Sequence, residues 1–183
     1  EGKAALKVAI RDNALTAFEL KLHDVSFEDK HKKFAFYSIQ ANIPWSYDDI
    51  KQVSFAYESG NLLNLPLGKT QIAAELNRYA LTAPTIRLPI LNGALNLKGV
   101  SAARIGTQWY WHLGAELSPI SMSDFSQALN LPRMEGQASA EIPLVTYQNG
   151  NLNTNGEMTF NIFNGQAIVT NLSMQTPLGD RPK

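Results

Sequence analysis

The chain of 183 residues contains no cysteine. This absence excludes disulfide bonds, a catalytic thiol, cysteine-ligated zinc and iron–sulfur clusters. It does not fix the compartment, because a protein without cysteine is stable in oxidising and in reducing surroundings. No run of apolar residues approaches the roughly 18 that a membrane-spanning helix needs.

Charged residues are also scarce, at 17% of the chain, against roughly 25% in typical soluble domains. Sixteen Lys and Arg residues balance sixteen Asp and Glu residues, so the formal net charge is zero. We therefore expect no nucleic-acid partner and no polybasic membrane tether, since both need a basic surface. Turn-forming residues are abundant instead, with fifteen Asn and twelve Gly, as is typical of a β-rich chain.

The main positive feature is a period of two. Apolar residues alternate with polar ones in several rows, which places the apolar side chains on one face of a sheet. The longest row runs through Trp109, Trp111, Leu113, Ala115 and Leu117. Turn signals separate the rows: Asn-Gly at 92–93, 149–150, 155–156 and 164–165, and Ser-Gly at 59–60. The pattern predicts a mainly β, antiparallel fold of about ten strands.

One segment departs from this period. Met122, Phe125 and Leu129 recur at helical spacing behind Ser121, which is a good N-cap residue. Pro132 prevents the helix from continuing. We expect one short helix near residues 121–130.

The chain is expected to be a single β domain over residues 1–183. It begins at Glu1 without Met or a signal peptide, so we expect a fragment of a longer protein. Residues 86–99 and 141–156 share the pattern N-G-x-L-N-x-x-G and suggest an internal repeat. The alternative is that unrelated hairpins converge on Asn-Gly because the turn favours it.

Motifs of catalysis are missing from the sequence: it has no G-x-S-x-G, H-E-x-x-H, P-loop or G-x-G-x-x-G. The adjacent Asp48 and Asp49 suit a turn better than shared acid–base work, because neighbours on a strand point to opposite faces. One group without fixed ligand spacing can be drawn as a metal site, although a solvated turn is favoured: His23, Asp24, Glu28, Asp29 and His31. We predict no enzyme activity, no catalytic residue, no metal and no cofactor.

Trp109 and Trp111 share one side of the longest row. Buried indoles would belong to a core, and exposed indoles would form a platform on which sugars stack. In a third arrangement, the row lines an apolar groove. A carbohydrate-binding or adhesive β-sandwich that uses exposed Trp109 and Trp111 is therefore the alternative function.

Several short segments along the chain combine Gly, Pro and apolar residues in a set order. The segments that carry it are Leu63-Asn-Leu-Pro-Leu-Gly68, Leu88-Pro-Ile-Leu-Asn-Gly93, Met134-Glu-Gly136, Glu141-Ile-Pro-Leu-Val-Thr-Tyr-Gln-Asn-Gly150, Gly156, Phe163-Asn-Gly165, Ile168-Val-Thr-Asn-Leu172 and Thr176-Pro-Leu-Gly179. This order resembles the YdbH-like proteins of the AsmA-like group, whose domain carries an older dicarboxylate-transport label. The resemblance covers roughly residues 15–180 and includes no catalytic signature.

The resemblance implies a strongly curved sheet, a trough with an apolar interior, although the pattern alone also allows a sandwich. Proteins of this family are anchored in the inner membrane of Gram-negative bacteria and are otherwise periplasmic. They are thought to carry phospholipids between the inner and outer membranes. A small outer-membrane lipoprotein that extends the sheet by β-strand addition is the implied partner.

The main prediction is therefore a non-enzymatic segment of an intermembrane phospholipid conduit. Apolar rows are predicted to contact lipid acyl chains through Ile39, Ile43, Phe55, Leu88, Trp109, Trp111, Phe160 and Ile162. The dicarboxylate label predicts instead a basic pocket. The arginines are too scattered along the sequence to indicate one: Arg78, Arg87, Arg104 and Arg133.

Overall fold

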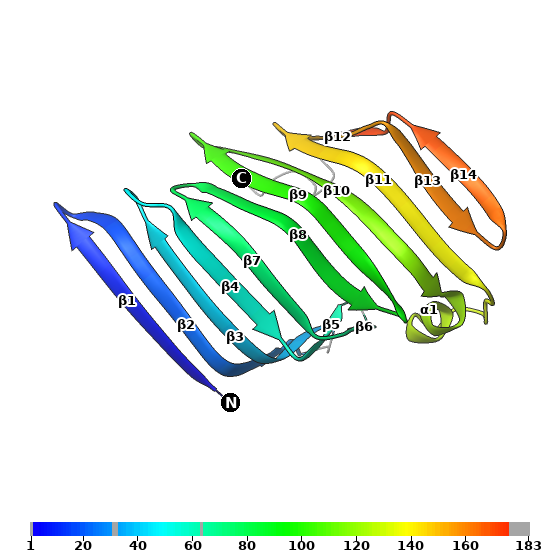
Figure 1. The fold of residues 1–183 in the computed structure, drawn as a ribbon, viewed down its shortest axis with the longest axis horizontal. Coiled ribbons are helices and arrows are strands. Elements are labelled where there is room, and N and C mark those ends of the chain that lie inside the picture. The colour runs from blue at the N-terminus through cyan, green and yellow to red at the C-terminus, as the bar shows by residue number, and fades with distance from the viewer. Residues whose placement is uncertain (1, 31–32, 63, 176–183) are drawn as a thin grey trace.

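The computed structural model of the chain describes residues 2–30, 33–62 and 64–175, which contain fifteen strands and one helix (Figure 1). The strands are β1 (Lys3–Arg11), β2 (Ala14–Glu28), β3 (Phe34–Ser46), β4 (Lys51–Tyr57), β5 (Ser59–Leu62), β6 (Leu65–Leu67), β7 (Thr70–Asn77), β8 (Ala80–Ile90), β9 (Gly93–Ile105), β10 (Gln108–Ser121), β11 (Gln137–Gln148), β12 (Asn151–Asn155), β13 (Glu157–Ile162), β14 (Gly165–Thr170) and β15 (Ser173–Gln175). The helix is α1 (Met122–Ala128). The mainly β class with one short helix is confirmed.

All fifteen strands belong to one sheet, and every pairing between them is antiparallel. Eleven strands follow one another on its main path, in the order β1-β2-β3-β4-β7-β8-β9-β10-β11-β12-β15. The other four strands, β5, β6, β13 and β14, lie off this path and pair where a neighbouring strand of the path has ended. For example, β4 and β5 both pair with β3, and β12 and β13 both pair with β11. The predicted number of about ten strands is close to the eleven strands of the main path. The four strands off this path account for the remainder of the fifteen.

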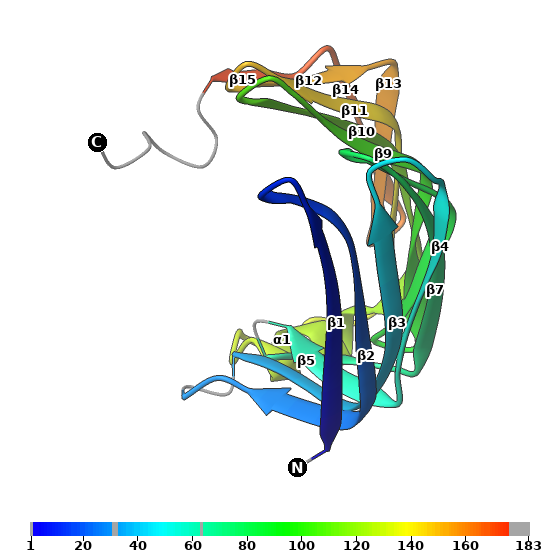
Figure 2. The same ribbon diagram turned by 90° about the vertical axis from the view of Figure 1, so that its left-hand side faces the viewer.

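The sheet is curled into a trough and does not form a sandwich of two packed sheets. Strands β1 and β14 lie at opposite ends of the long axis (Figure 1). Seen from the β1 end, the ribbon has the profile of a letter C that is open on one side (Figure 2). The strands therefore bend around the trough, and its axis runs from strand to strand. Hairpin turns form its two rims.

Bulges allow the long strands to bend and keep their apolar residues on one side. Between β2 and β3 the register shifts twice, on either side of the pair formed by Val25 and Ile39. Leu22 and Val25 are three residues apart, yet both pack against the same core cluster. An extra residue in one strand bends it and reverses the phase of the alternation. The bulges therefore contribute both to the curvature and to the separation of the faces.

Two of the predicted turns are displaced by one residue. Asn149 and Gly150 occupy the turn as expected, both with positive φ. At the signals 92–93 and 164–165, by contrast, the turn residues are 91–92 and 163–164, and Gly93 and Gly165 begin the next strands. A tight turn of this kind needs positive φ at two positions, and Leu91 and Phe163 take the first of them.

The remaining two signals do not mark hairpins. Residues 155–156 lie at the break between β12 and β13, where Gly156 has a φ of 95°. Residues 59–60 lie within β5. The two copies of the candidate repeat also differ in place, because the turn of 86–99 lies beside α1 and that of 141–156 lies at the opposite rim (Figure 1). The repeat stays a prediction.

Helix α1 begins as predicted. The Ser121 side chain caps it by accepting a hydrogen bond from the backbone N–H of Asp124 at 3.2 Å. Met122 and Phe125 pack with Leu91 and Ile120, which anchors the helix to the sheet. The helix lies at the lower lip of the C-shaped profile (Figure 2).

Candidate functional site

Strand register places apolar side chains from the whole sheet on one side. One row of directly paired residues crosses six strands: Leu88, Leu95, Leu117, Ala140, Phe160 and Ala167. Near the other end, Leu20 lies opposite both Leu6 and Ile43. Helix α1, which occupies the concave side, packs on this surface beside Leu117. We call it the inner face.

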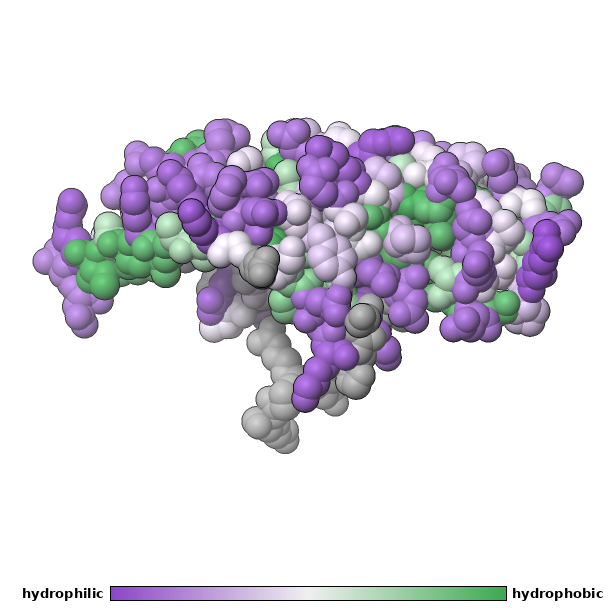
Figure 3. All heavy atoms as spheres, turned by 90° about the horizontal axis from the view of Figure 1, so that it is seen from below, coloured by the Kyte–Doolittle hydropathy of each residue, from purple (hydrophilic) through white to green (hydrophobic). Residues whose placement is uncertain are grey.

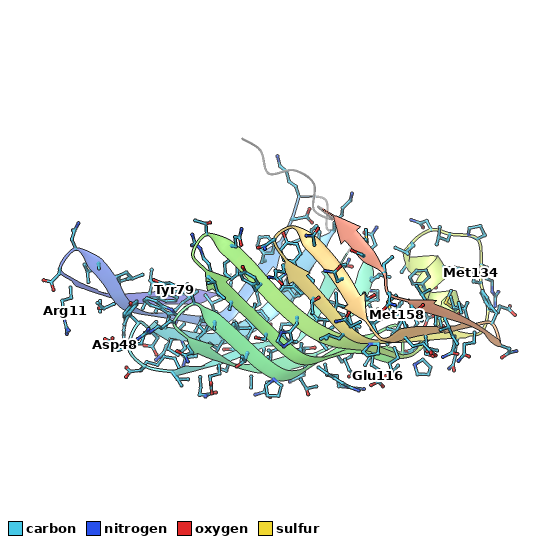
Figure 4. The ribbon with its side chains drawn as sticks, turned by 90° about the horizontal axis from the view of Figure 1, so that it is seen from above. Arg11, Asp48, Tyr79, Glu116, Met134 and Met158 are labelled. Carbon is cyan, nitrogen blue, oxygen red and sulfur yellow. The ribbon has the colours of Figure 1, made fainter. Side chains whose placement is uncertain are left out.

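Polar side chains occupy the convex side, which we call the outer face. Lys7 lies opposite Glu19, and Glu116 lies opposite Glu141. Glu116 also forms an ion pair with Lys98, and its side chain is labelled on the convex side in Figure 4. The alternation seen in the sequence therefore divides an apolar concave face from a polar convex one.

All eight residues predicted to contact lipid lie on the inner face by register: Ile39, Ile43, Phe55, Leu88, Trp109, Trp111, Phe160 and Ile162. Their accessibility differs. Ile39 is only 7% exposed because it packs within a core cluster with Ala41, Tyr57 and Leu67. Trp109 is 49% exposed. The arrangement groups the eight side chains on one surface, and their contact with lipid remains a prediction.

Two core clusters seal part of the inner face. One joins β3, β4 and β6 around Tyr57, and the other joins α1 to Leu91, Ile120 and Ala138. Both include residues near the rim that carries β5 and α1. Apolar side chains elsewhere on this face remain accessible: Leu6, Val8 and Ile10 are all more than half exposed. Figure 3 shows apolar residues exposed at the end of the molecule formed by β1 and β2.

A hollow of about 360 Å³ lies on the inner face at the rim opposite α1. Its apolar floor is formed by Leu76, Leu81 and Ala102, three neighbours across β7, β8 and β9. Tyr79 and Trp109 stand at its edge, and Figure 4 labels Tyr79 at this rim. An apolar chain placed in this hollow would be partly shielded from water by the floor.

The aromatic residues of the inner face form two stacked pairs. Trp111 stacks on Tyr147 with ring centroids 5.5 Å apart, and Phe18 stacks on Trp45 at 5.7 Å. Trp109 is half exposed beside them. One side of the Trp111 ring is therefore covered by Tyr147, which leaves Trp109 as the more open indole of the predicted platform.

Two of the groups considered for chemistry, Asp49 and His23, have structural partners. Asp49 accepts hydrogen bonds from Lys51 at 3.2 Å and from Ser46 at 3.3 Å in the turn after β3. His23 shares a hydrogen bond with Gln40 through Nδ1 at 2.9 Å. Within residues 2–30, 33–62 and 64–175, no three His or carboxylate groups are close enough to hold a metal ion. His31 lies outside the described residues.

Ion pairs shift the pKa of several surface groups. A hydrogen bond from Lys21, with Lys7 at 3.8 Å, holds the pKa of the Glu19 carboxyl below its ordinary value. The bond from Lys51 lowers the pKa of Asp49 in the same way. The hydrogen bond to Glu116 raises the pKa of Lys98. These pairings neutralise charge on the outer face and at the rim, and none provides a free acid or base.

A second hollow, of about 460 Å³, opens on the outer face where β9, β10 and β11 are irregular. Lys98, Glu116 and Glu141 line it beside Gly114. Its central charges are already joined in the Lys98–Glu116 ion pair. It combines these charged groups with apolar residues such as Ile142 and Leu144. It lies on the side of the sheet away from the predicted lipid contacts.

No family model, no curated protein and no solved structure matches the chain. The resemblance to the YdbH-like proteins therefore stands on the motifs alone, and its Thr176-Pro-Leu-Gly179 element lies outside the described residues. Among the helices of the described part, none is long and apolar enough to cross a membrane.

Proposed function

We propose that the chain is a non-enzymatic segment of a conduit for phospholipids, in which acyl chains lie along the inner face. The observation that carries this proposal is the continuity of the apolar surface. Directly paired apolar residues follow one another across the strands, and neighbouring polar residues point to the other side. A chain can thus pass from strand to strand along the trough axis without crossing a charged row.

Burial of methylene groups supplies the driving force. Each CH₂ removed from water contributes about 0.8 kcal/mol, so an acyl chain needs no polar recognition to be held. A surface that binds by area alone also allows sliding, because successive positions along the axis are similar in energy. A conduit requires that the lipid is held on the surface without being fixed at one position.

The cellular setting of the proposal comes from the resemblance to YdbH-like proteins. In that setting the parent protein is periplasmic, is anchored in the inner membrane and moves phospholipid between the inner and outer membranes. A small outer-membrane lipoprotein would pair with an open edge of the sheet. Strand β1 offers such an edge, because in the described residues it pairs only with β2.

Glycan binding by Trp109 and Trp111 has less support. Stacked sugars need open ring faces, and Tyr147 covers one side of Trp111. The polar side chains that would orient hydroxyl groups lie mainly on the outer face.

Photocrosslinking from paired positions tests the proposal. A benzophenone amino acid is placed at 88 or 111 on the inner face, and at the neighbouring positions 87 or 112 on the outer face as matched controls. The chain is exported to the periplasm of Gram-negative cells grown with radioactive phosphate. We expect labelled phospholipid adducts from 88 and 111 and little from 87 and 112.

Equal labelling from both faces, or no labelling from the inner one, would contradict the proposal. The same variants irradiated with labelled oligosaccharide provide the comparison for the glycan alternative. A sugar adduct at 111 without a lipid adduct would favour that alternative.

A further inference from the structure

Two arginines from different segments of the chain line the rim hollow. Arg78 lies in the turn between β7 and β8, and Arg104 lies near the end of β9. The backbone N–H of Arg104 donates to the carbonyl of Tyr79 at 3.0 Å, so the two segments are adjacent. Both arginines line the hollow whose floor is Leu76, Leu81 and Ala102. Positive charge and apolar surface therefore meet at one place.

Each guanidinium is oriented by a bond through its Nε atom. Arg78 donates to the Tyr47 carbonyl at 2.9 Å and lies 4.8 Å from the centre of the Tyr47 ring. Arg104 donates to the Gly106 carbonyl at 3.2 Å. The turn itself is fixed by Trp45, whose Nε1 donates to the Arg78 carbonyl at 2.6 Å. Within the described residues, these bonds use Nε and give the terminal nitrogens of neither side chain an acceptor.

Neither arginine forms an ion pair with a carboxylate among the described residues. The nearby turn after β3 contains Asp48 and Asp49, and Asp49 is engaged by Lys51. Other basic groups are paired, such as Lys98 with Glu116 and Arg133 with Glu135. Arg78 and Arg104 therefore supply two positive charges, neither of them ion-paired within the described residues, at the border of an apolar hollow.

We propose that Arg78 and Arg104 bind the phosphate headgroup of a phospholipid whose acyl chain lies on the inner face. Arginine suits this role because its terminal N–H groups fit phosphate oxygens in pairs, and such charge-assisted bonds are strong. Trp109 and Tyr79 line the same hollow, and amphipathic rings are favourable where charge and apolar surface meet. This inference rests on the proposed function and adds to it a place where the headgroup is held.

A pair of single-chain amphiphiles separates the two claims. Dodecyl phosphate and dodecanol have the same apolar chain and differ in the charged group, and both are titrated below micelle formation while tryptophan fluorescence is followed. We expect dodecyl phosphate to bind about tenfold more tightly, as one good charge-assisted interaction would give. Inorganic phosphate at millimolar concentration should compete little, because it lacks the chain.

The double variant Arg78→Gln/Arg104→Gln should lose this preference and keep its affinity for dodecanol. Arg87→Gln/Arg133→Gln is the matched control. It removes the same charge from the outer face, where Arg87 bonds to Asn96, and from the Arg133–Glu135 pair. It should leave the preference unchanged. If the first double variant does not fold, the single Arg104→Glu replaces it and should bind dodecyl phosphate no better than dodecanol.

Equal affinity of the wild type for the two amphiphiles would overturn this inference and leave the proposed function standing. Binding of neither would overturn both. Competition by inorganic phosphate as strong as dodecyl phosphate itself would identify a site for the free anion and overturn the lipid assignment.

Discussion

At the scale of single residues, Tyr57 places a polar group in the apolar packing of the inner face. Tyr57 is 2% exposed within the core cluster of Ile39, Ala41 and Leu67, and its hydroxyl has no hydrogen-bond partner among the residues that the structure describes. A buried hydroxyl of this kind costs free energy, because it has lost its water without a replacement.

We predict that Tyr57→Phe raises the free energy of unfolding by about 1 kcal/mol, because the unsatisfied hydroxyl is removed and the ring contacts stay. Urea unfolding followed by fluorescence measures the change. Tyr37→Phe is the control, since its hydroxyl donates to Glu28 at an exposed site and its loss should be neutral or slightly destabilising. A loss of stability in Tyr57→Phe would mean that the hydroxyl has a partner, such as a buried water.

Charge on the outer face predicts a pH dependence with a definite sign. Because Lys21 and Lys7 lower the pKa of Glu19 on folding, its ionised form stabilises the native state. This contribution is complete above the ordinary value of 4.5 and is lost as the pH falls through the lowered pKa. Glu19→Gln should therefore be less stable than the wild type at neutral pH, and the difference should vanish in acid.

Urea unfolding at several pH values measures this difference for Glu19→Gln. In the background Lys7→Gln/Lys21→Gln the same substitution should have almost no effect at any pH. High salt should reduce the difference in the wild type, because exposed ion pairs are screened. A difference that grew in acid would contradict the pairing.

At the scale of elements, the sequence was sufficient for the mainly β class and for the short helix, but it predicted about ten strands where the structure has fifteen. Alternation identified the rows, and Ser121 with Pro132 bounded α1. The turns at 91–92 and 163–164 were misplaced because Asn-Gly was expected to fill both turn positions. Packing decides the first case, since Leu91 is only 7% exposed in the cluster around Ile120. No local sequence pattern predicts that a buried leucine adopts a positive φ.

The two turns should respond differently to glycine. Phe163 has a φ of 51° and is 53% exposed, so Phe163→Gly should stabilise the protein by about 1 kcal/mol through relief of left-handed strain. Leu91→Gly relieves the same strain at φ 50° but empties a core position, so it should destabilise by about 2 kcal/mol or more. Thermal unfolding of both variants tests the contrast, and a gain in both would show that Leu91 contributes little to packing.

At the scale of the whole molecule, the composition of the inner face could be predicted and its geometry could not. The eight predicted lipid contacts share that face because alternation fixes which side a residue takes. The curvature depends on bulges that interrupt the alternation, and only the family resemblance suggested it. Arg78 and Arg104 are far apart in the sequence, so their meeting required the register of β8 and β9.

The sheet is also an array in which strands contact mainly their neighbours along the path. Strand β1 pairs with β2 and β2 pairs with β3, whereas β9, β10 and β11 pair with one another farther along the path. In such an array, stability is close to a sum of local terms and nearest-neighbour interfaces. Ends can therefore open without the centre, which also suits a surface that can be extended strand by strand.

We predict that Leu20→Ala increases amide hydrogen exchange in residues 3–28 and leaves residues 93–148 almost unchanged. Leu20 lies opposite Leu6 in β1 and Ile43 in β3, so its loss weakens the first two strand interfaces. Leu117→Ala is the converse control. It removes a side chain that lies between Leu95 and Ala140, and it should accelerate exchange around β9, β10 and β11. Mass spectrometry of peptides under native conditions measures both. Uniform acceleration over the whole chain by Leu20→Ala would show a single cooperative unit, in which the trough forms only as a whole.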